Sequence, residues 1–219
     1  MKKKLIAALL IGATVLPALQ GCFPVVAAGV TTGVLAAVDR RTLGTQTEDE
    51  AIEWKASGRL KDKFGNNTHI NFTSFNRKVL MTGEAPSEEA KAEIERISAS
   101  VSNVQGVYNH IRVAAPSSFA DRSNDAFISS KIKTRSLDNG KFSPVHVKVV
   151  TEAGVAYLMG LVTEAEADAA ISVARTTAGV KKVVNLFEIV TPAEARALDL
   201  AQKSNNKAPP ADTDSQQKP

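Results

Sequence analysis

Cys22 is the only cysteine of the 219 residues, and its surroundings favour covalent attachment of lipid. Three lysines at positions 2–4 precede an apolar segment over residues 5–16, and the run Leu19-Gln20-Gly21-Cys22 follows. An aliphatic residue three positions before a cysteine and a small residue directly before it are typical of a lipobox. The 12 residues of the apolar segment reach about 18 Å as a helix, which is too short for a hydrocarbon core of about 30 Å. We therefore predict a lipoprotein signal peptide; the alternative is an ordinary secretory signal followed by an incidental cysteine.

Acylation of Cys22 would decide where the mature chain resides. Cleavage before this residue leaves a diacylglycerol on its thiol and a further acyl chain on its amine, and two or more chains hold a protein stably on a membrane. Phe23 follows, so the sequence carries no inner-membrane retention signal of the enterobacterial kind. A lone cysteine also excludes an internal disulfide and a four-thiolate metal site. We expect a chain anchored to the outer membrane through acylated Cys22 and facing the periplasm.

A second group of residues that could do chemistry lies on one predicted helix, Asn124–Leu137. At 100° per residue, Ile128 and Ile132 fall within about 40° of each other and form its buried stripe. Beside that stripe an aromatic ring accompanies cations and hydroxyls, a combination that suits the headgroup boundary of an acidic membrane. The candidate lipid-binding residues are Phe127, Ser130, Lys131, Lys133, Thr134 and Arg135. The alternative is a slightly rotated helix that buries Phe127 in the core and leaves a merely solvated basic face.

The sequence contains histidines and carboxylates, residue types that often act in catalysis, but their spacing matches no catalytic motif. The chain has three histidines, of which His69 and His146 occupy equivalent strand positions beside core residues, so we expect both to face solvent. The sequence motifs of serine hydrolases, zinc proteases, phosphate-binding loops and dinucleotide-binding folds do not occur in the sequence. The adjacent carboxylates Glu88 and Glu89 lie on a polar helix face without a partner base. We predict that the protein is not an enzyme and holds neither a cofactor nor a metal ion.

The charge balance argues against a nucleic-acid partner. The whole chain has 27 basic and 23 acidic residues, and the signal peptide accounts for three of the lysines. The mature chain therefore has 27 minus 3, or 24, basic residues against 23 acidic ones, a net charge near +1. Such a chain has no general electrostatic attraction for nucleic acid, and any basic surface must be local.

An internal repeat predicts two domains of the same kind. Val79–Gly83 matches Ala156–Gly160 at an offset of 77 residues. At the same offset Ile70 and Phe72 match Val147 and Val149. At an offset of 76, Asp49 and Ile52 match Asp125 and Ile128, and Val104, Val107 and Asn109 match Val180, Val183 and Asn185. Each copy has about 70 residues, close to the lower limit for a self-sufficient core.

Both copies predict the element order α-β-β-α-β, and hence an α+β fold. In the first copy we expect helices over Glu48–Lys63 and Pro86–Ser100 and strands over Thr68–Thr73, Lys78–Thr82 and Val107–Val113. In the second we expect helices over Asn124–Leu137 and Glu164–Thr177 and strands over Val145–Val150, Val155–Met159 and Lys182–Val190. Gly83 and Gly160 each end the second strand of their copy, where a residue without Cβ suits a positive φ or close backbone packing.

The repeat and the composition together predict the division of the chain. We expect a signal peptide over residues 1–21, a membrane-proximal spacer over 22–45, a first domain over 46–114, a linker over 115–123, a second domain over 124–191, and a short helix with a disordered polar tail over 192–219.

The repeated unit resembles the BON domain. The resemblance rests on the α-β-β-α-β order, the strand ends at Gly83 and Gly160, the pairs Gly106-Val107 and Gly179-Val180, and the run Asp39–Gln46 before the first copy. With the lipobox, the arrangement over roughly residues 19–190 is similar to that of the dual-BON lipoproteins of Gram-negative bacteria.

This resemblance implies a non-enzymatic protein that helps to maintain outer-membrane integrity. It also implies binding of anionic phospholipids, such as phosphatidylglycerol and cardiolipin, through the first helix of the second domain. The family usually has tryptophan where this chain has Phe127, and phenylalanine keeps the apolar area but lacks the indole N–H. The alternative function is that of an adaptor for envelope proteins without specific lipid recognition, which requires a larger apolar patch elsewhere.

The difference between the two copies supports the second-domain helix as the lipid-binding element. Phe127 corresponds to Ala51 in the first copy, so the fold itself does not demand an aromatic residue at this position. Residues 122–141 hold five basic and two acidic residues, whereas residues 48–63 hold four basic and five acidic residues.

Overall fold

The structure is a computed structural model, and it describes residues 39–65 and 68–205. The predicted signal peptide, Cys22 and most of the predicted spacer lie outside the described residues, as does the polar tail from residue 206.

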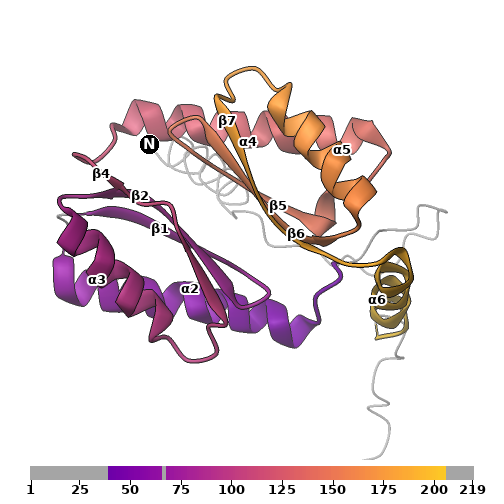
Figure 1. The fold of residues 1–219 in the computed structure, drawn as a ribbon, viewed down its shortest axis with the longest axis horizontal. Coiled ribbons are helices and arrows are strands. Elements are labelled where there is room, and N and C mark those ends of the chain that lie inside the picture. Colours follow the sequence, from indigo (N-terminus) through magenta and orange to yellow (C-terminus); the bar gives the residue numbers. More distant parts are fainter. Residues whose placement is uncertain (1–38, 66–67, 206–219) are drawn as a thin grey trace, which may run out of the picture. The chain divides into compact units, whose positions relative to one another are not determined.

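The first domain consists of two helices on one face of a small mixed sheet (Figure 1). Its elements are α2 (Leu43–Phe64), β1 (His69–Phe75), β2 (Lys78–Ala85), α3 (Glu88–Ala99), β3 (Gly106–Asn109) and β4 (Arg112–Val113). Strand β2 pairs antiparallel with β1 and parallel with both β3 and β4. Ile52 and Ile94 come from the two helices, Phe72 and Met81 from the sheet, and all four are buried in one core.

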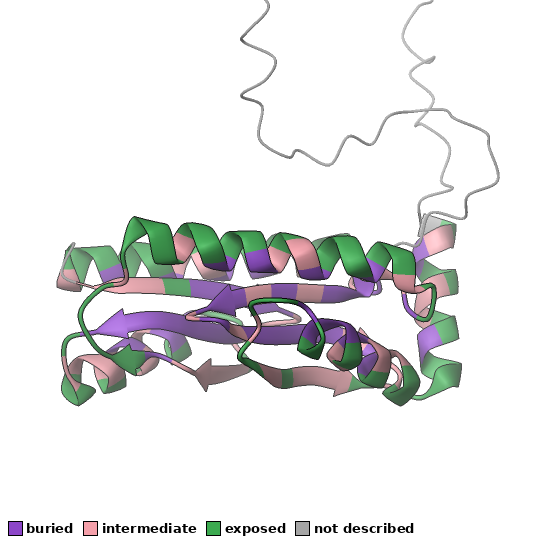
Figure 2. Cartoon of the chain, turned by 90° about the horizontal axis from the view of Figure 1, so that it is seen from above, coloured by how far each residue is buried: buried purple, intermediate pink, exposed green. Residues whose placement is uncertain are grey.

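The second domain repeats this arrangement. Its elements are α4 (Phe119–Asn139), the 3-10 turn η2 (Pro144–His146), β5 (Val147–Glu152), β6 (Val155–Val162), α5 (Glu164–Arg175) and β7 (Lys182–Ile189), followed by α6 (Pro192–Asn205). Strand β6 again pairs antiparallel with the strand before it and parallel with the strand after α5. The predicted α+β fold and the α-β-β-α-β order of both copies are confirmed. The hairpin strands β1, β2, β5 and β6 are mostly buried, whereas β3, β4 and β7 are intermediate or exposed; Figure 2 shows both kinds of strand, and helices whose outer sides are exposed.

One aspartate in each domain joins the first helix to the first hairpin. Asp49 of α2 accepts hydrogen bonds from the amides of Asn76 and Arg77, at 2.8 and 2.7 Å. Asp125 of α4 accepts from the amides of Ala153 and Gly154, at 2.7 and 2.9 Å. All four turn residues have positive φ, between 51° and 77°. A left-handed conformation costs a non-glycine residue about 1 kcal/mol or more, and a charged acceptor for both turn amides offsets that cost.

Gly83 and Gly160 occupy positions where a side chain has no room. A Cβ on Gly83, whose φ is +107°, would lie 1.9 Å from the carbonyl oxygen of His69. A Cβ on Gly160 would lie 2.3 Å from the carbonyl oxygen of His146. Each strand continues for two residues beyond the glycine that was predicted to end it, and at this glycine it passes directly against the backbone that begins the first hairpin.

The sheet faces turned away from the helices pack against each other. Phe75 and Leu80 of the first domain form one buried cluster with Tyr157 and Met159 of the second. Polar contacts surround this cluster: Lys148 donates to Glu53 at 3.0 Å, and Lys78 pairs with Glu188 at 2.8 Å. Each sheet is thus covered on both faces, on one by its own helices and on the other by the neighbouring domain.

The prediction that His146 faces solvent is wrong. The residue is 5% exposed, because it lies in the turn η2 before the strand rather than in the strand itself. Pro144 begins that turn and delays the start of β5 to Val147, two residues after the predicted start at Val145. His69 is the first residue of β1 and is partly buried, so neither histidine is simply a solvent-facing strand residue.

The helix that precedes each sheet begins earlier than predicted. α2 starts at Leu43 rather than Glu48, with Thr42 as its N-cap. α4 starts at Phe119 rather than Asn124, within residues predicted to be linker. In both cases the first turns make few core contacts, so the apolar periodicity that marks the helix begins only later. The predicted strand Val107–Val113 is divided into β3 and β4.

Candidate functional site

Helix α4 positions the candidate lipid-binding residues, and both of its ends are well defined. Ser118 and Asp121 form a capping box in which each side chain accepts a hydrogen bond from the backbone of the other. Gly140 ends the helix in a left-handed conformation with φ 66°. Ile128 and Ile132 are both 1% exposed within the second core, so the buried stripe fixes how the helix is rotated about its axis.

Phe127 lies outside that core. Its exposed fraction is 62%, so the alternative in which the helix buries this ring is wrong. Beside the ring is an open hollow of about 470 Å³, which we call the α4 groove. Its lining residues are Phe127, Ser130, Lys131, Thr134 and Arg135 of α4 and Thr176, Thr177 and Ala178 after α5. The structure therefore gathers five of the six candidate residues around one groove.

Two cations border the α4 groove, and both are held by the end of α5. The Lys131 Nζ lies 4.8 Å from the centroid of the Phe127 ring and also donates to the carbonyl oxygen of Ala178. The Arg135 guanidinium donates to the carbonyl oxygen of Val173 at 3.0 Å and to the Thr177 hydroxyl at 2.7 Å. A cation is favourable at a helix C-terminus, where the last carbonyl groups lack partners within the helix. Lys131 and Arg135 are therefore also structural, and their heads have fixed positions at the rim.

Lys133 is the candidate residue that the structure separates from the others. Six residues after Phe127, it lies about 120° away around the helix axis, because 600° is one full turn and 240°. It lines a different hollow, together with Asn71 of the first domain and Ser129 and Glu152 of the second.

Two further apolar residues of α4 are exposed, and the sequence reasoning missed them. Phe119 is 79% and Leu137 is 71% exposed. Phe119 precedes Phe127 by eight residues and Leu137 follows it by ten, so both lie about 80° from Phe127 on the same side, near Ser130. The early start of the helix hid Phe119, because that residue was assigned to the linker. The exposed face of α4 thus offers apolar side chains along its whole length.

The corresponding helix of the first domain presents a different surface. Trp54 of α2 is 79% exposed, and at the offset of 76 it corresponds to Ser130. It was not predicted as a site residue, although it is the only tryptophan of the chain. Lys55, which corresponds to Lys131, lies 4.0 Å from the Glu48 carboxylate. The first helix therefore combines an exposed aromatic ring with acids, and the second combines one with cations.

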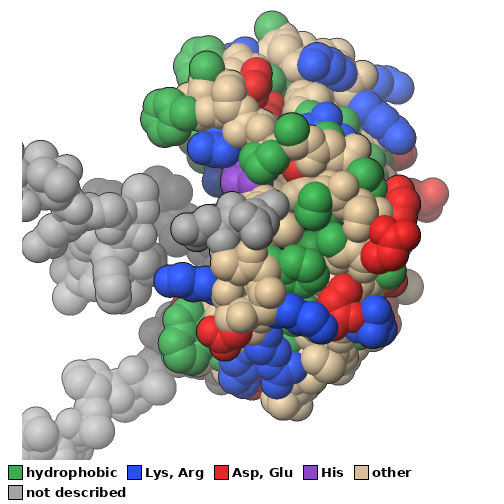
Figure 3. Space-filling model, turned by 90° about the vertical axis from the view of Figure 1, so that its left-hand side faces the viewer, with side chains coloured by type: hydrophobic (Ala, Val, Ile, Leu, Met, Phe, Trp, Pro, Cys, Tyr) green, Lys and Arg blue, Asp and Glu red, His purple; other side chains and the backbone are tan. Residues whose placement is uncertain are grey.

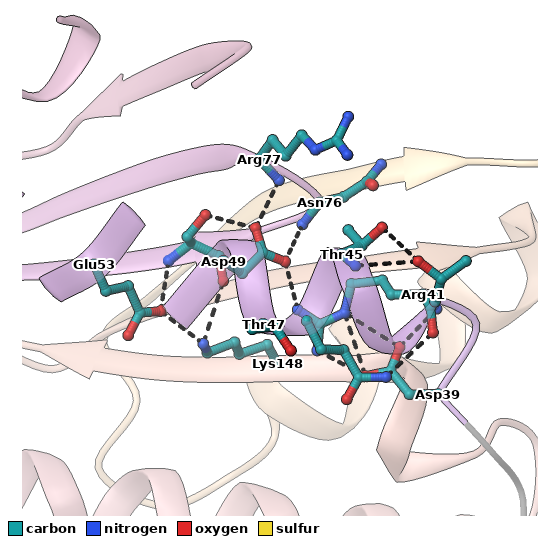
Figure 4. A network of polar contacts seen from close by, with 12 residues as sticks. Asp39, Arg41, Thr45, Thr47, Asp49, Glu53, Asn76, Arg77 and Lys148 are labelled. Carbon is teal, nitrogen blue, oxygen red and sulfur yellow. Dashed lines mark hydrogen bonds and ion pairs between the residues drawn. The ribbon is translucent and has the colours of Figure 1, made fainter. Parts of the chain in front are cut away.

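The run Asp39–Gln46 ties the two domains together. The Arg41 guanidinium donates to Asp49 at 2.8 Å and to Asp39 at 2.7 Å, and it lies 4.0 Å over the Phe75 ring (Figure 4). All of these partners belong to the first domain or to the run itself. Arg41 therefore extends the network of polar contacts that surrounds Asp49.

Arg40 enters the second domain instead. Its guanidinium, in a residue that is 5% exposed, donates to Glu166 of α5 at 2.8 Å and to Asp199 of α6 at 2.9 Å. Burial by itself would raise the pKa of the Glu166 carboxyl, but hydrogen bonds from Arg40 and Thr163 lower that pKa below its ordinary value. Two neighbouring arginines thus fix the segment before α2 to both domains.

Charges of both signs are present on one further face of the molecule. On the face drawn in Figure 3, lysine and arginine side chains lie among acidic ones, with hydrophobic side chains between them. No helix within the described ranges 39–65 and 68–205 is long and apolar enough to cross a membrane.

Comparison with known proteins gives a consistent family match. The BON domain family matches residues 49–115 and 124–191. The outer membrane lipoprotein DolP of Haemophilus influenzae is 36% identical over 183 residues, which cover 83% of this chain and 94% of that protein. The 21 kDa hemolysin of Actinobacillus pleuropneumoniae is also 36% identical, over 70% of this chain and 80% of that protein. The osmotically-inducible protein Y of Escherichia coli is 31% identical, over 65% of this chain and 73% of that protein.

Proposed function

Because this chain belongs to the family of dual BON-domain outer-membrane lipoproteins, we propose that it is a non-enzymatic protein that binds anionic phospholipid through α4. Phosphatidylglycerol and cardiolipin are the expected lipids, and maintenance of outer-membrane integrity is the expected role. The observation that carries the proposal is the position of Phe127, which is 62% exposed beside the α4 groove and lies next to Lys131.

The chemistry of this face suits an acidic membrane surface. An exposed aromatic ring gains free energy when it enters the headgroup boundary, and each nearby lysine or arginine adds about 1 kcal/mol on an anionic surface. Phe119 and Leu137 extend the apolar surface on both sides of the ring.

The tether strengthens this binding. Acylation of Cys22, which lies outside the described residues, would hold the domains within reach of the membrane. Sixteen residues lie between Cys22 and Asp39, and an extended chain from Cys22 to Asp39 spans about 60 Å at most. Binding through α4 is then intramolecular, so a weak affinity for individual headgroups suffices.

An adaptor for envelope proteins is the second candidate function, and Trp54 is the observation that favours it. This ring is 79% exposed on a helix with an acidic excess, which an anionic membrane does not attract. Aromatic side chains that protrude from a surface are typical anchors of protein interfaces.

The lipid proposal is tested by co-sedimentation of the protein with vesicles. The protein used consists of residues 23–219, so that it has no acylated cysteine and can bind only through its domains. Vesicles of phosphatidylcholine alone are compared with vesicles enriched in phosphatidylglycerol or cardiolipin. We expect binding to the anionic vesicles only, weakened by salt, and about tenfold weaker for Phe127→Ala because this variant loses the apolar ring that lies beside Lys131 and the α4 groove.

Trp54→Ala is the matched control, since it removes an even more exposed aromatic residue, 79% against 62%, from the equivalent helix of the other domain. We expect this variant to bind anionic vesicles as the unchanged chain does. Equal losses in the two variants would contradict a site on α4, and absence of binding by the folded protein would overturn the proposal. The adaptor function would then become the leading explanation.

A further inference from the structure

Three potential metal ligands meet where the two sheets face each other. His69 of β1 and Glu84 of β2 are a cross-strand pair, so their side chains lie on the same face of the first sheet. Asn71 and Thr82 form the next pair on that face. Glu152, the last residue of β5, comes from the second domain and points at these four side chains, as its contacts with Asn71 and Thr82 show.

The distances within this group are short. The Nδ1 atom of His69 lies 3.3 Å from the Oε2 atom of Glu84. One ligand atom each from His69, Glu84 and Glu152 can be chosen so that all three lie within 4.8 Å of one another. Ligand atoms of a tetrahedral zinc ion, each about 2.1 Å from the metal, lie about 3.4 Å apart. Only small side-chain adjustments separate the observed arrangement from such a site.

The charges at the site point to a cation. Glu84 is fully buried, but it is paired with Arg112 and accepts a hydrogen bond from the amide of Ser117 at 3.1 Å. Glu152 is 6% exposed, and within the described residues it accepts side-chain hydrogen bonds only from the neutral groups of Asn71 and Thr82, at 3.0 and 3.3 Å. Among the described residues it takes part in no ion pair, although burial of a carboxylate is costly without a positive partner.

In the second domain an arginine compensates the charge of the partly buried carboxylates beside the equivalent histidine. His146, which corresponds to His69, also lies beside two carboxylates, at 3.9 Å from Glu166 and 3.7 Å from Asp199. Arg40 pairs with both of these acids and neutralises them. No equivalent cation reaches Glu152 within the described part of the chain.

We propose that His69, Glu84 and Glu152 bind one zinc ion between the two domains. One imidazole nitrogen and two carboxylate oxygens are ligands that zinc accepts, and a water molecule would complete the tetrahedron. Asn71 and Thr82 hold the Glu152 carboxylate, and Arg112 holds that of Glu84, as outer-sphere hydrogen bonds commonly do around zinc. The site goes beyond the lipid-binding function and does not depend on it.

A path for the ion is present. His69 and Glu152 line an open hollow of about 520 Å³, which also borders Asn71, Asp125 and Lys133. A hydrated ion can reach His69 and Glu152 from this side without separation of the domains. Because two ligands belong to the first domain and one to the second, a bound ion stabilises the association of the domains as well as the fold.

Isothermal titration of the full chain in detergent with zinc chloride, after removal of metals with a chelator, tests the proposal. We expect one ion per chain and a melting temperature that rises with zinc. Glu152→Gln should weaken zinc binding at least tenfold and abolish the rise in melting temperature. This substitution keeps the shape of the side chain and its acceptor for Asn71 and Thr82, so the variant should fold.

His69→Ala should weaken zinc binding to a similar extent, and His110→Ala is its control. His110 stacks on Tyr157 with ring centroids 4.9 Å apart and is not a member of the proposed ligand set. We expect His110→Ala to bind zinc as the unchanged chain does. Unaltered zinc affinity in Glu152→Gln, or no binding by the unchanged chain at micromolar zinc, would overturn the proposal.

Discussion

The two BON domains have one fold but differ where the fold leaves the residue free. Both have an aspartate that binds the hairpin turn and a glycine packed against the backbone of the first hairpin. Their first helices differ on the outer face, where Trp54 accompanies acids and Phe127 accompanies cations. Features shared by the copies are therefore those that the backbone needs, and the differences identify surfaces that are available for binding.

The same comparison applies to the polar clusters of the two domains. In the second domain Arg40 neutralises the carboxylates beside His146. Around His69 of the first domain, Arg112 pairs with Glu84 alone, and Glu152, which reaches this site from the second domain, accepts side-chain hydrogen bonds within the described residues only from the neutral groups of Asn71 and Thr82. The two equivalent histidines thus have different surroundings. Those of His146 include the ion pairs of Arg40, which fix the segment before α2 to the second domain, and those of His69 suit a metal ion.

The largest expected effect comes from removing the shared aspartates. Asp49→Ala should lower the free energy of unfolding by about 4 kcal/mol, because it leaves two turn amides, Ser74 and Arg41 without their acceptor. Asp125→Ala should cost about 2 kcal/mol, since only the amides of Ala153 and Gly154 lose a partner. Denaturation in urea measures both values. A larger loss in Asp125→Ala would contradict this ranking.

A smaller difference in the free energy of unfolding is expected between variants of Arg59 and Arg135, which occupy equivalent positions in α2 and α4. Arg135→Ala should lower the free energy of unfolding by about 1.5 kcal/mol, because the end of α5 loses the hydrogen bonds to Val173 and Thr177. Arg59→Ala should change it by less than about 0.5 kcal/mol, since within the described residues the side chain of Arg59 donates only to the exposed hydroxyl of Ser100. Urea denaturation of the two variants decides the point, and equal effects would show that α5 does not depend on Arg135.

Aromatic residues introduced into α2 and α4 test whether the two helices differ in their binding to anionic vesicles. Ser130→Trp adds the ring of the first domain to the cationic helix and should strengthen binding to phosphatidylglycerol vesicles about fivefold. Ala51→Phe places the ring of the second domain on α2, where acids are in excess, and should leave vesicle binding within about twofold. If Ala51→Phe strengthened binding as much as Ser130→Trp, charge would not distinguish the two helices.

The smallest expected effect concerns pH. Because the pKa of Glu166 is lower in the folded chain than in the unfolded one, its contribution to stability is complete above the ordinary glutamate pKa near 4.3. That contribution is lost as the pH falls through the lowered pKa. The unchanged chain should therefore lose more stability on acidification from pH 5 to pH 3 than Glu166→Gln does. Parallel pH profiles of the melting temperature would show that Arg40 does not stabilise the ionised form.

Local patterns were enough to predict both domains and the rotation of α4. The periodicity of Ile128 and Ile132 places Phe127 outside the core, and the structure agrees, with an exposed fraction of 62% for the ring. The offsets of the repeat likewise predicted that Asp49 and Asp125 are equivalent. These properties depend on residues within a few turns of one helix or within one hairpin, so the sequence reports them directly.

Contacts between distant segments were not predicted. The runs Val79–Met81 and Ala156–Met159 are apolar at successive positions, a pattern that indicates a sheet covered on both faces. That signal could have revealed the packing of one sheet against the other, and with it the partial burial of His69. Trp54 was missed because periodicity describes the buried stripe of a helix and says little about which exposed residue is unusual.

The sequence by itself determined the two copies of one α+β domain and the helix that carries Phe127, since both rest on short-range patterns, and the lipobox around Cys22 stays a prediction. Only the tertiary structure decided that Lys133 is separated from the α4 groove, that Arg40 and Arg41 bind different domains, and that Glu152 meets His69 and Glu84. The physical reason is that these outcomes depend on how two sheets pack face to face. That packing brings together side chains from separate domains, and no spacing along the chain records it.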